Sequence, residues 1–220
     1  MVTNMEKQEY VYIVLIKALT GLGKVGRKIT KYDYTHIALS MDEKLDDFIT
    51  FSRKKHYSPF ESGYMHETRD CYIFGSNEKV KIKVFKLPIK KENLKKINTY
   101  IKKIEKDPEY IFNLYSMLTM PIINGFRIYK AHNCMSFIAK IIELSQVVSM
   151  DKRYYKYTIK DMDELLSNFL YYEDYIRKYK DDNKNYMDRI GVIKNIKFFC
   201  ILNGKLLYRM VRKGGKSHAR

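Results

Sequence analysis

The sequence predicts an α+β fold in which a mainly antiparallel sheet packs against helices. Short segments rich in β-branched and aromatic residues occupy most of positions 10–87, as is typical of strands. Apolar residues at helical spacing then dominate positions 90–145. Because strands come first and helices follow, the order favours an α+β class with about five or six strands.

Five segments are predicted as strands before Pro88. They are 10–19, 34–40, 46–52, 71–74 and 79–87. The glycine-rich stretch 21–26 and the segment 53–68 are predicted as loops. The glycines match neither the P-loop nor the dinucleotide-binding spacing, so no phosphate or cofactor site is predicted there.

Helices are predicted to follow Pro88. Positions 90–106 carry a lysine-rich amphipathic helix with one apolar face, formed by Leu94, Ile97, Ile101 and Ile104. The next helix is expected to start at Asp107-Pro108 and to reach about Leu118, because proline suits the first helical turn.

The stretch 131–143 holds the main candidate for a reactive group. Its apolar residues recur at helical spacing, at positions 134, 137, 138, 141 and 142. Asn133 is a favourable N-cap, which places Cys134 in the first helical turn. Unpaired amide groups and the positive end of the helix dipole favour a thiolate there. Cys134 is therefore a candidate nucleophile, although a free cysteine can also simply begin a buried apolar stripe.

His36 is the candidate base, in the predicted strand 34–40. Side chains alternate along a strand, so Tyr34 and His36 are expected on one face. A hairpin centred near Glu43 sets Thr50 across from His36, with Ser52 as the alternative if the register slips. A lone strand histidine is also commonly structural or solvated, and His132, just before Cys134, is expected to be solvated near the helix cap.

Together these segments resemble the circularly permuted papain-like hydrolases, the YiiX-like branch of the NlpC-type superfamily. The resemblance covers roughly positions 10–180, and the histidine strand precedes the cysteine helix, the reverse of ordinary papain-like enzymes. Positions 161–166 and 171–176 look like the family's closing helix and strand. The matching stretches are 19–21, 32–39, 51–54, 59–67, 132–139, 161–166 and 171–176.

The resemblance implies a permuted papain-like fold and a cysteine hydrolase or acyltransferase acting on an amide or ester bond. The expected substrates are peptide-like, amino-acyl or lipid molecules. It implies Cys134 as nucleophile, His36 as general acid and base, and the Tyr34 hydroxyl as a candidate oxyanion donor, with a packed aromatic as the alternative role. The third catalytic position is filled by Thr50 as candidate orienter, and Glu67 would reach it only if its loop folds back.

Length and composition fit a catalytic domain over 1–180 with a basic extension over 181–220. The chain has 220 residues and 45% hydrophobic residues, enough for a single core. Its three cysteines match no zinc spacing and no disulfide framework, so no metal or cofactor is predicted.

The N-terminus resembles no secretory signal, and the apolar run 11–16 is far shorter than the ~20 residues of a spanning helix. A cytoplasmic location, with peripheral membrane contact, is expected.

The net charge of +17 suggests a second class of function. Positions 181–220 hold ten basic and three acidic residues among many apolar ones. This segment is expected to form a helix and a short hairpin around Asn203-Gly204, with 212–220 disordered. It would lie on the core or on an anionic membrane surface. The alternative to the enzyme is a catalytically silent basic module that binds anionic membrane or, as the less favoured partner, nucleic acid.

Overall fold

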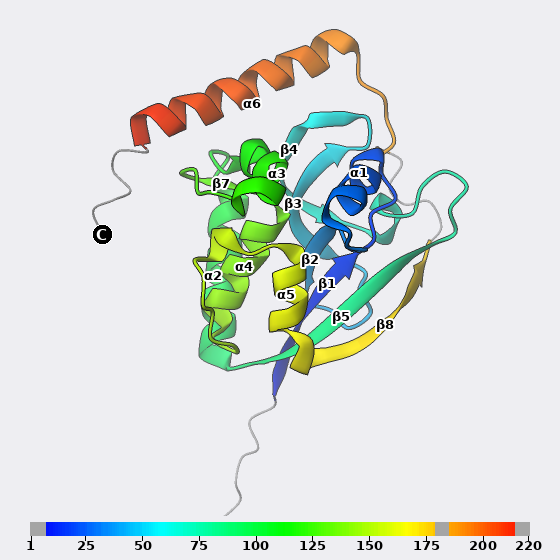
Figure 1. The fold of residues 1–220 in the computed structure, drawn as a ribbon, viewed down its shortest axis with the longest axis vertical. Coiled ribbons are helices and arrows are strands. Elements are labelled where there is room, and N and C mark those ends of the chain that lie inside the picture. The colour runs from blue at the N-terminus through cyan, green and yellow to red at the C-terminus, as the bar shows by residue number, and fades with distance from the viewer. Residues whose placement is uncertain (1–7, 179–184, 214–220) are drawn as a thin grey trace, which may run out of the picture.

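The computed structural model describes residues 8–178 and 185–213 (Figure 1). Within these residues the chain forms an α+β fold with a six-stranded antiparallel sheet, six α-helices and a small two-stranded parallel sheet. The large sheet comprises β1 (Glu9–Ile16), β2 (His36–Ser40), β3 (Phe48–Lys55), β4 (Ser58–Glu67), β5 (Lys79–Ile89) and β8 (Leu170–Arg177). The small sheet pairs β6 (Ile111–Phe112) with β7 (Ala131–His132).

One described helix lies between β1 and β2, and the other five come after β5. In chain order, the helices are α1 (Gly21–Thr30), α2 (Lys91–Lys106), α3 (Leu114–Ile123), α4 (Cys134–Ser145), α5 (Ile159–Leu165) and α6 (Val192–Lys213). None of the described helices has the length and apolar character needed to cross a bilayer.

The strand order in the large sheet is β4-β3-β2-β1-β5-β8. β1 lies between β2 and β5 and is buried on both faces, which explains why positions 11–16 are continuously apolar rather than alternating. One face packs against a core that includes Phe137, Ile138 and Ile141 of α4. Figure 1 shows α2, α4 and α5 gathered on the same side of the sheet. The other face covers a second core that contains Phe48 and Tyr72.

Two predicted loops are regular elements instead. Positions 58–67 form the edge strand β4, where Pro59 is tolerated because an edge strand leaves one row of groups unpaired. Positions 21–30 form α1, because the Thr20 hydroxyl accepts a hydrogen bond from the Gly23 amide at 3.0 Å. Gly23 is needed there, since a Cβ would lie 2.5 Å from the Ala18 carbonyl oxygen.

Other predicted boundaries also shift. The predicted strand 71–74 was wrong, because Arg69–Cys71 form a 3₁₀ turn and the next strand begins only at Lys79. The helix expected from Asp107 begins only at Leu114, because Asn113 accepts a hydrogen bond from the Ser116 amide and caps it.

The hairpin predicted at Asn203-Gly204 was wrong, because α6 runs through it as one continuous helix. Leu202 and Leu206 are buried against the β6–β7 region, so tertiary packing overrides the turn signal. Of the tail expected to be disordered, Arg212 and Lys213 belong to α6, and 214–220 lie outside the described residues.

Candidate active site

The first turn of α4 presents Cys134 at a well-defined helix start. Asn133 Oδ1 accepts a hydrogen bond from the Ser136 amide at 2.8 Å, and Ser136 Oγ accepts one from the Asn133 amide at 3.1 Å. This reciprocal capping box fixes the first helical residue as Cys134. In any α-helix the first amide groups have no intrahelical acceptor, so those of Cys134 and Met135 are free to bind an anion.

His36 opens β2 and meets the nucleophile candidate there. The Cys134 thiol lies close enough to the His36 ring to help raise its pKa. The ring Nε2 lies 3.0 Å from Oε2 of Glu67, and the side chains of His36 and Glu67 are only 13% and 1% exposed. Because Nε2 faces the carboxylate, Nδ1 is the nitrogen that remains for the thiol.

The Glu67 carboxylate is itself held in place. Glu67 ends β4, and the Tyr72 hydroxyl donates to its Oε2 at 2.7 Å. The Ser52 side chain on β3 lies near the carboxylate and further lowers its pKa. Thus the structure assembles Cys134, His36 and Glu67 from α4, β2 and β4.

The pKa values of the pair follow from this geometry. Burial alone would lower the pKa of His36, but the Glu67 charge, the nearby Cys134 thiol and the hydrogen bond that His36 donates to Glu67 raise it to about 10. Burial likewise opposes ionisation of Glu67, but the charge and hydrogen bond of His36 outweigh it and lower the pKa of that carboxyl. At neutral pH the two groups therefore form a buried imidazolium–carboxylate pair.

Thr50 does not orient the histidine, which corrects the sequence-based prediction. Its hydroxyl is buried and donates to the Ile37 carbonyl at 3.0 Å. The β2–β3 register pairs Leu39 with Ile49, and extending it sets Ser52 rather than Thr50 opposite His36. The Glu67 carboxylate contacts His36 directly, so it fills the position that was assigned to a hydroxyl.

Among the described residues, the Tyr34 hydroxyl makes no hydrogen bond with Cys134, His36 or Glu67, so its predicted role as an oxyanion donor stays a prediction. Its buried ring lies 5.9 Å from the Tyr32 ring, and burial first, followed by Glu173 on β8, raises the pKa of its hydroxyl. β8 and β4 are at opposite edges of the sheet, so the Tyr34 hydroxyl and the Glu67 carboxylate belong to different environments. The expectation of a shared face fails because β2 begins only at His36, and strict alternation does not extend back to Tyr34.

His132 is buried, not solvated as predicted. Its Nε2 lies 3.0 Å from the Tyr100 hydroxyl, and its ring is stacked on Tyr110 with centroids 6.0 Å apart. Burial first, and then the charges of Arg127 and Lys140, lower the pKa of His132 to about 3. His132 is thus neutral and supports the β7 segment that leads into Cys134. Among the residues that the structure describes, no group of three His, Cys, Asp or Glu side chains is arranged to hold a metal ion.

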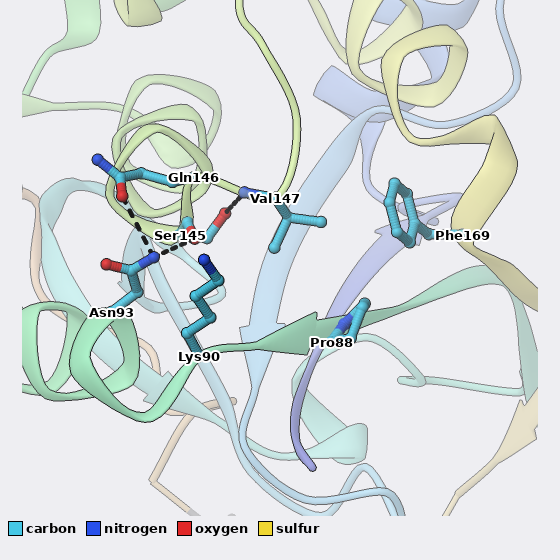
Figure 2. A pocket seen from close by; sticks show the side chains of 7 residues that line it. All are labelled: Pro88, Lys90, Asn93, Ser145, Gln146, Val147 and Phe169. Carbon is cyan, nitrogen blue, oxygen red and sulfur yellow. Dashed lines mark hydrogen bonds between the residues drawn. The ribbon is translucent and has the colours of Figure 1, made fainter.

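A pocket of about 380 Å³ lies elsewhere, at the other end of α4 (Figure 2). Asn93 Nδ2 donates to the Ser145 carbonyl at 2.9 Å beside this pocket, next to Gln146. Cys134 and Ser145 are the first and last residues of α4. At a rise of about 1.5 Å per residue they are roughly 16 Å apart. The pocket is therefore separate from the Cys134 site.

No family model, curated protein or solved structure matches the chain. The structure defines an α+β protein with a Cys–His–Glu cluster at the start of a buried helix.

Proposed function

We propose that this protein is a cysteine hydrolase or acyltransferase with a circularly permuted papain-like fold, acting on an amide or ester bond. Cys134 is the nucleophile, His36 the general acid and base, and Glu67 the residue that orients His36. One observation supports the proposal most. A single, largely buried imidazole contacts a buried carboxylate and lies beside a thiol at a helix N-terminus that helps raise its pKa.

The charges in the cluster suit nucleophilic catalysis. A neighbouring imidazolium and a helix N-terminus both favour a thiolate. The Cys134 sulfur attacks the substrate carbonyl carbon, and the amide groups of Cys134 and Met135 are the oxyanion donors. The Glu67 carboxylate compensates the imidazolium charge, which Thr50 could not do.

The proposed reaction then has two halves. Collapse of the tetrahedral intermediate breaks the carbonyl–nitrogen or carbonyl–oxygen bond, and His36 transfers its proton to the leaving group. This leaves a thioester on Cys134. In the second half, His36 takes a proton from water or from an acceptor alcohol or amine, which attacks the thioester and releases Cys134. Water gives hydrolysis, and another acceptor gives acyl transfer.

The chain order supports the permuted assignment. The histidine strand β2 precedes the nucleophile helix α4, and α5 and β8 follow it. The antiparallel strands β4-β3-β2-β1-β5 carry the histidine and the carboxylate beside the helix that carries the thiol.

The reactivity of the three cysteines tests the proposal within one molecule. Cys134 is partly buried, Cys200 is exposed and Cys71 is buried. At limiting iodoacetamide and about pH 6, where an ordinary exposed thiol is almost wholly protonated, we expect Cys134 to be alkylated at least about tenfold faster than Cys200. Mass spectrometry of the three tryptic peptides gives the rates.

The His36→Ala variant should remove this advantage while leaving the Cys200 rate unchanged. A Cys134 that reacts more slowly than Cys200 and is indifferent to His36→Ala would refute the Cys–His pair. A probe with an electrophilic acyl group should, in addition, acylate the wild type but not Cys134→Ala.

A further inference from the structure

The helix α6 has two apolar strips, and only one of them faces the rest of the protein. The inner strip contacts the domain through a Phe199–Phe60 ring pair with centroids 4.9 Å apart and through buried Leu202 and Leu206. Polar contacts add to it, because the Tyr115 hydroxyl donates to Asn203 Oδ1 at 2.7 Å. In Figure 1, α6 runs along the outside of the molecule beyond α3 and β4.

The second strip, called here the outer strip, follows helical spacing on a different side of α6. Four of its side chains are strongly exposed: Ile193 by 85%, Ile196 by 57%, Leu207 by 54% and Val211 by 83%. Cys200 and Gly204 continue the same strip and are also exposed. Nothing in the described part of the chain covers these residues, so the strip is left facing water.

Charge on α6 indicates what covers the outer strip. The 22 residues of α6 contain no Asp or Glu. Their exposed charges are all basic and lie beside the outer strip, at Lys194, Lys197, Lys205 and Arg212. A surface that is both apolar and cationic complements the boundary of an anionic bilayer, where hydrocarbon and phosphate lie at adjacent depths.

We propose that α6 lies in the surface of a membrane rich in anionic lipid, with the outer strip in the hydrocarbon boundary and the lysines among the headgroups. A second copy fits less well, because pairing two such helices would bring basic flanks together without acidic partners. Nucleic acid would satisfy the lysines but leave the outer strip in water. Binding of this kind does not depend on whether Cys134 is catalytic.

The attachment of α6 connects this surface to the candidate site. Arg209 donates from its guanidinium to the carbonyl oxygens of Glu109, Tyr129 and Lys130, at 2.7, 3.1 and 2.9 Å. Lys130 immediately precedes β7, which leads through Asn133 to Cys134. A bilayer bound by α6 would therefore be linked, through Arg209, to the β7 segment that precedes Cys134.

Cosedimentation with phosphatidylcholine vesicles, with and without phosphatidylserine, tests the proposal on the full chain. The wild type should pellet with the anionic vesicles only, and less as salt rises. The double variant Ile193→Ser/Val211→Ser should lower the partition coefficient about tenfold or more. The triple variant Lys194→Gln/Lys197→Gln/Lys205→Gln should lower it on the order of 100-fold, at about fivefold per lysine.

Matched control variants distinguish an effect of the α6 surface from an effect of total exposed apolar area or net charge. Leu170→Ser/Tyr175→Ser removes two side chains of β8 that are 48% and 50% exposed. Lys91→Gln/Lys95→Gln/Lys102→Gln removes the same charge from the exposed side of α2. Both should keep wild-type partition within about twofold, since neither set lies on α6. Circular dichroism should be unchanged in all variants, because the altered residues lie outside the core.

Equal partition of the α6 variants and their controls would overturn the proposal. So would equal pelleting with neutral vesicles, which would remove the role of the lysines. If the wild type instead bound RNA, or self-associated through the outer strip, without binding vesicles, the occupant would be nucleic acid or a second copy.

Discussion

Nε2 of His36 lies 3.0 Å from Oε2 of Glu67, although the two residues belong to strands separated by β3. His36 begins β2 and Glu67 ends β4, so the contact crosses the intervening strand at the place where Ser52 lies near the carboxylate. A buried ion pair of this kind depends strongly on both partners, because removal of one leaves the other charge uncompensated.

Replacing Glu67 by Gln should lower the pKa of His36. The variant keeps the shape and a hydrogen-bonding group but removes the charge that outweighs burial. We expect the His36 pKa to fall from about 10 by at least about two pH units. An NMR titration of the imidazole carbon-bound protons measures it directly.

Asp47→Asn is the matched control for Glu67→Gln. Asp47 contacts His66 at 2.8 Å on the surface, and its hydrogen bond raises the pKa of that histidine. The control should lower the pKa of His66 and leave His36 unchanged. A His36 titration curve that is the same in wild type and Glu67→Gln would contradict the assigned role of Glu67.

Loss of the Asn133 cap should slow the alkylation of Cys134 by more than the accompanying loss of stability would explain. Asn133→Ala removes the acceptor of the Ser136 amide and should lower the free energy of unfolding by about 1 kcal/mol. It also loosens the turn that holds Cys134 against His36. The iodoacetamide rate of Cys134 at about pH 6 should therefore fall severalfold.

Thr158→Ala provides the comparison for the Asn133 cap. Thr158 caps α5 through the same kind of capping box, with the Asp161 amide donating to its hydroxyl at 3.1 Å. This variant should cost a similar free energy of unfolding, about 1 kcal/mol, and leave the Cys134 rate unchanged. If both variants slow alkylation equally, general destabilisation rather than the position of the thiol explains the effect.

His132 should make the fold sensitive to mild acid. Its pKa in the folded protein is about 3, below the ordinary value of 6.5, so only the unfolded chain takes up this proton between those values. Stability from His132 is complete above pH 6.5 and is lost as pH falls toward 3, by up to about 1.4 kcal/mol per pH unit.

His132→Phe should remove this acid-dependent loss. It also removes the Tyr100 hydrogen bond, which costs about 1 kcal/mol at neutral pH. Urea unfolding from about pH 7 to pH 4 should give a flatter stability profile for His132→Phe than for the wild type. His66→Gln, whose parent histidine has a raised pKa, should not flatten it. Parallel profiles for His132→Phe and the wild type would argue against a buried neutral His132.

The two residues at the centre of the candidate site were accessible from local sequence patterns. Asn133 and the apolar stripe after it predict a helix that begins at Cys134, and the structure has its first helical residue there. The aromatic and β-branched residues around His36 predict a strand, and β2 starts at His36. Both predictions rest on capping and side-chain periodicity, which act over a few residues.

Glu67 was predicted to reach the third catalytic position only if its loop folded back, because its position depends on long-range pairing. Positions 58–67 contain Pro59 and Gly63 and lack an alternating apolar pattern, since β4 is an edge strand in which partly buried Tyr64 bonds to exposed His66. A shift in the predicted β2–β3 register then favoured Thr50. A carboxylate two strands from the histidine can be placed only once the full strand order is known.

Arg209 also sets a sequence of events during biosynthesis. The chain emerges from the ribosome N-terminus first, so β6, β7 and Cys134 are synthesised well before Arg209. Until α6 docks, the carbonyl groups of Glu109, Tyr129 and Lys130 lack the guanidinium that holds them together. The guanidinium that contacts the segment before Cys134 is therefore available only after the residues of the strands that carry His36 and Glu67 have been synthesised.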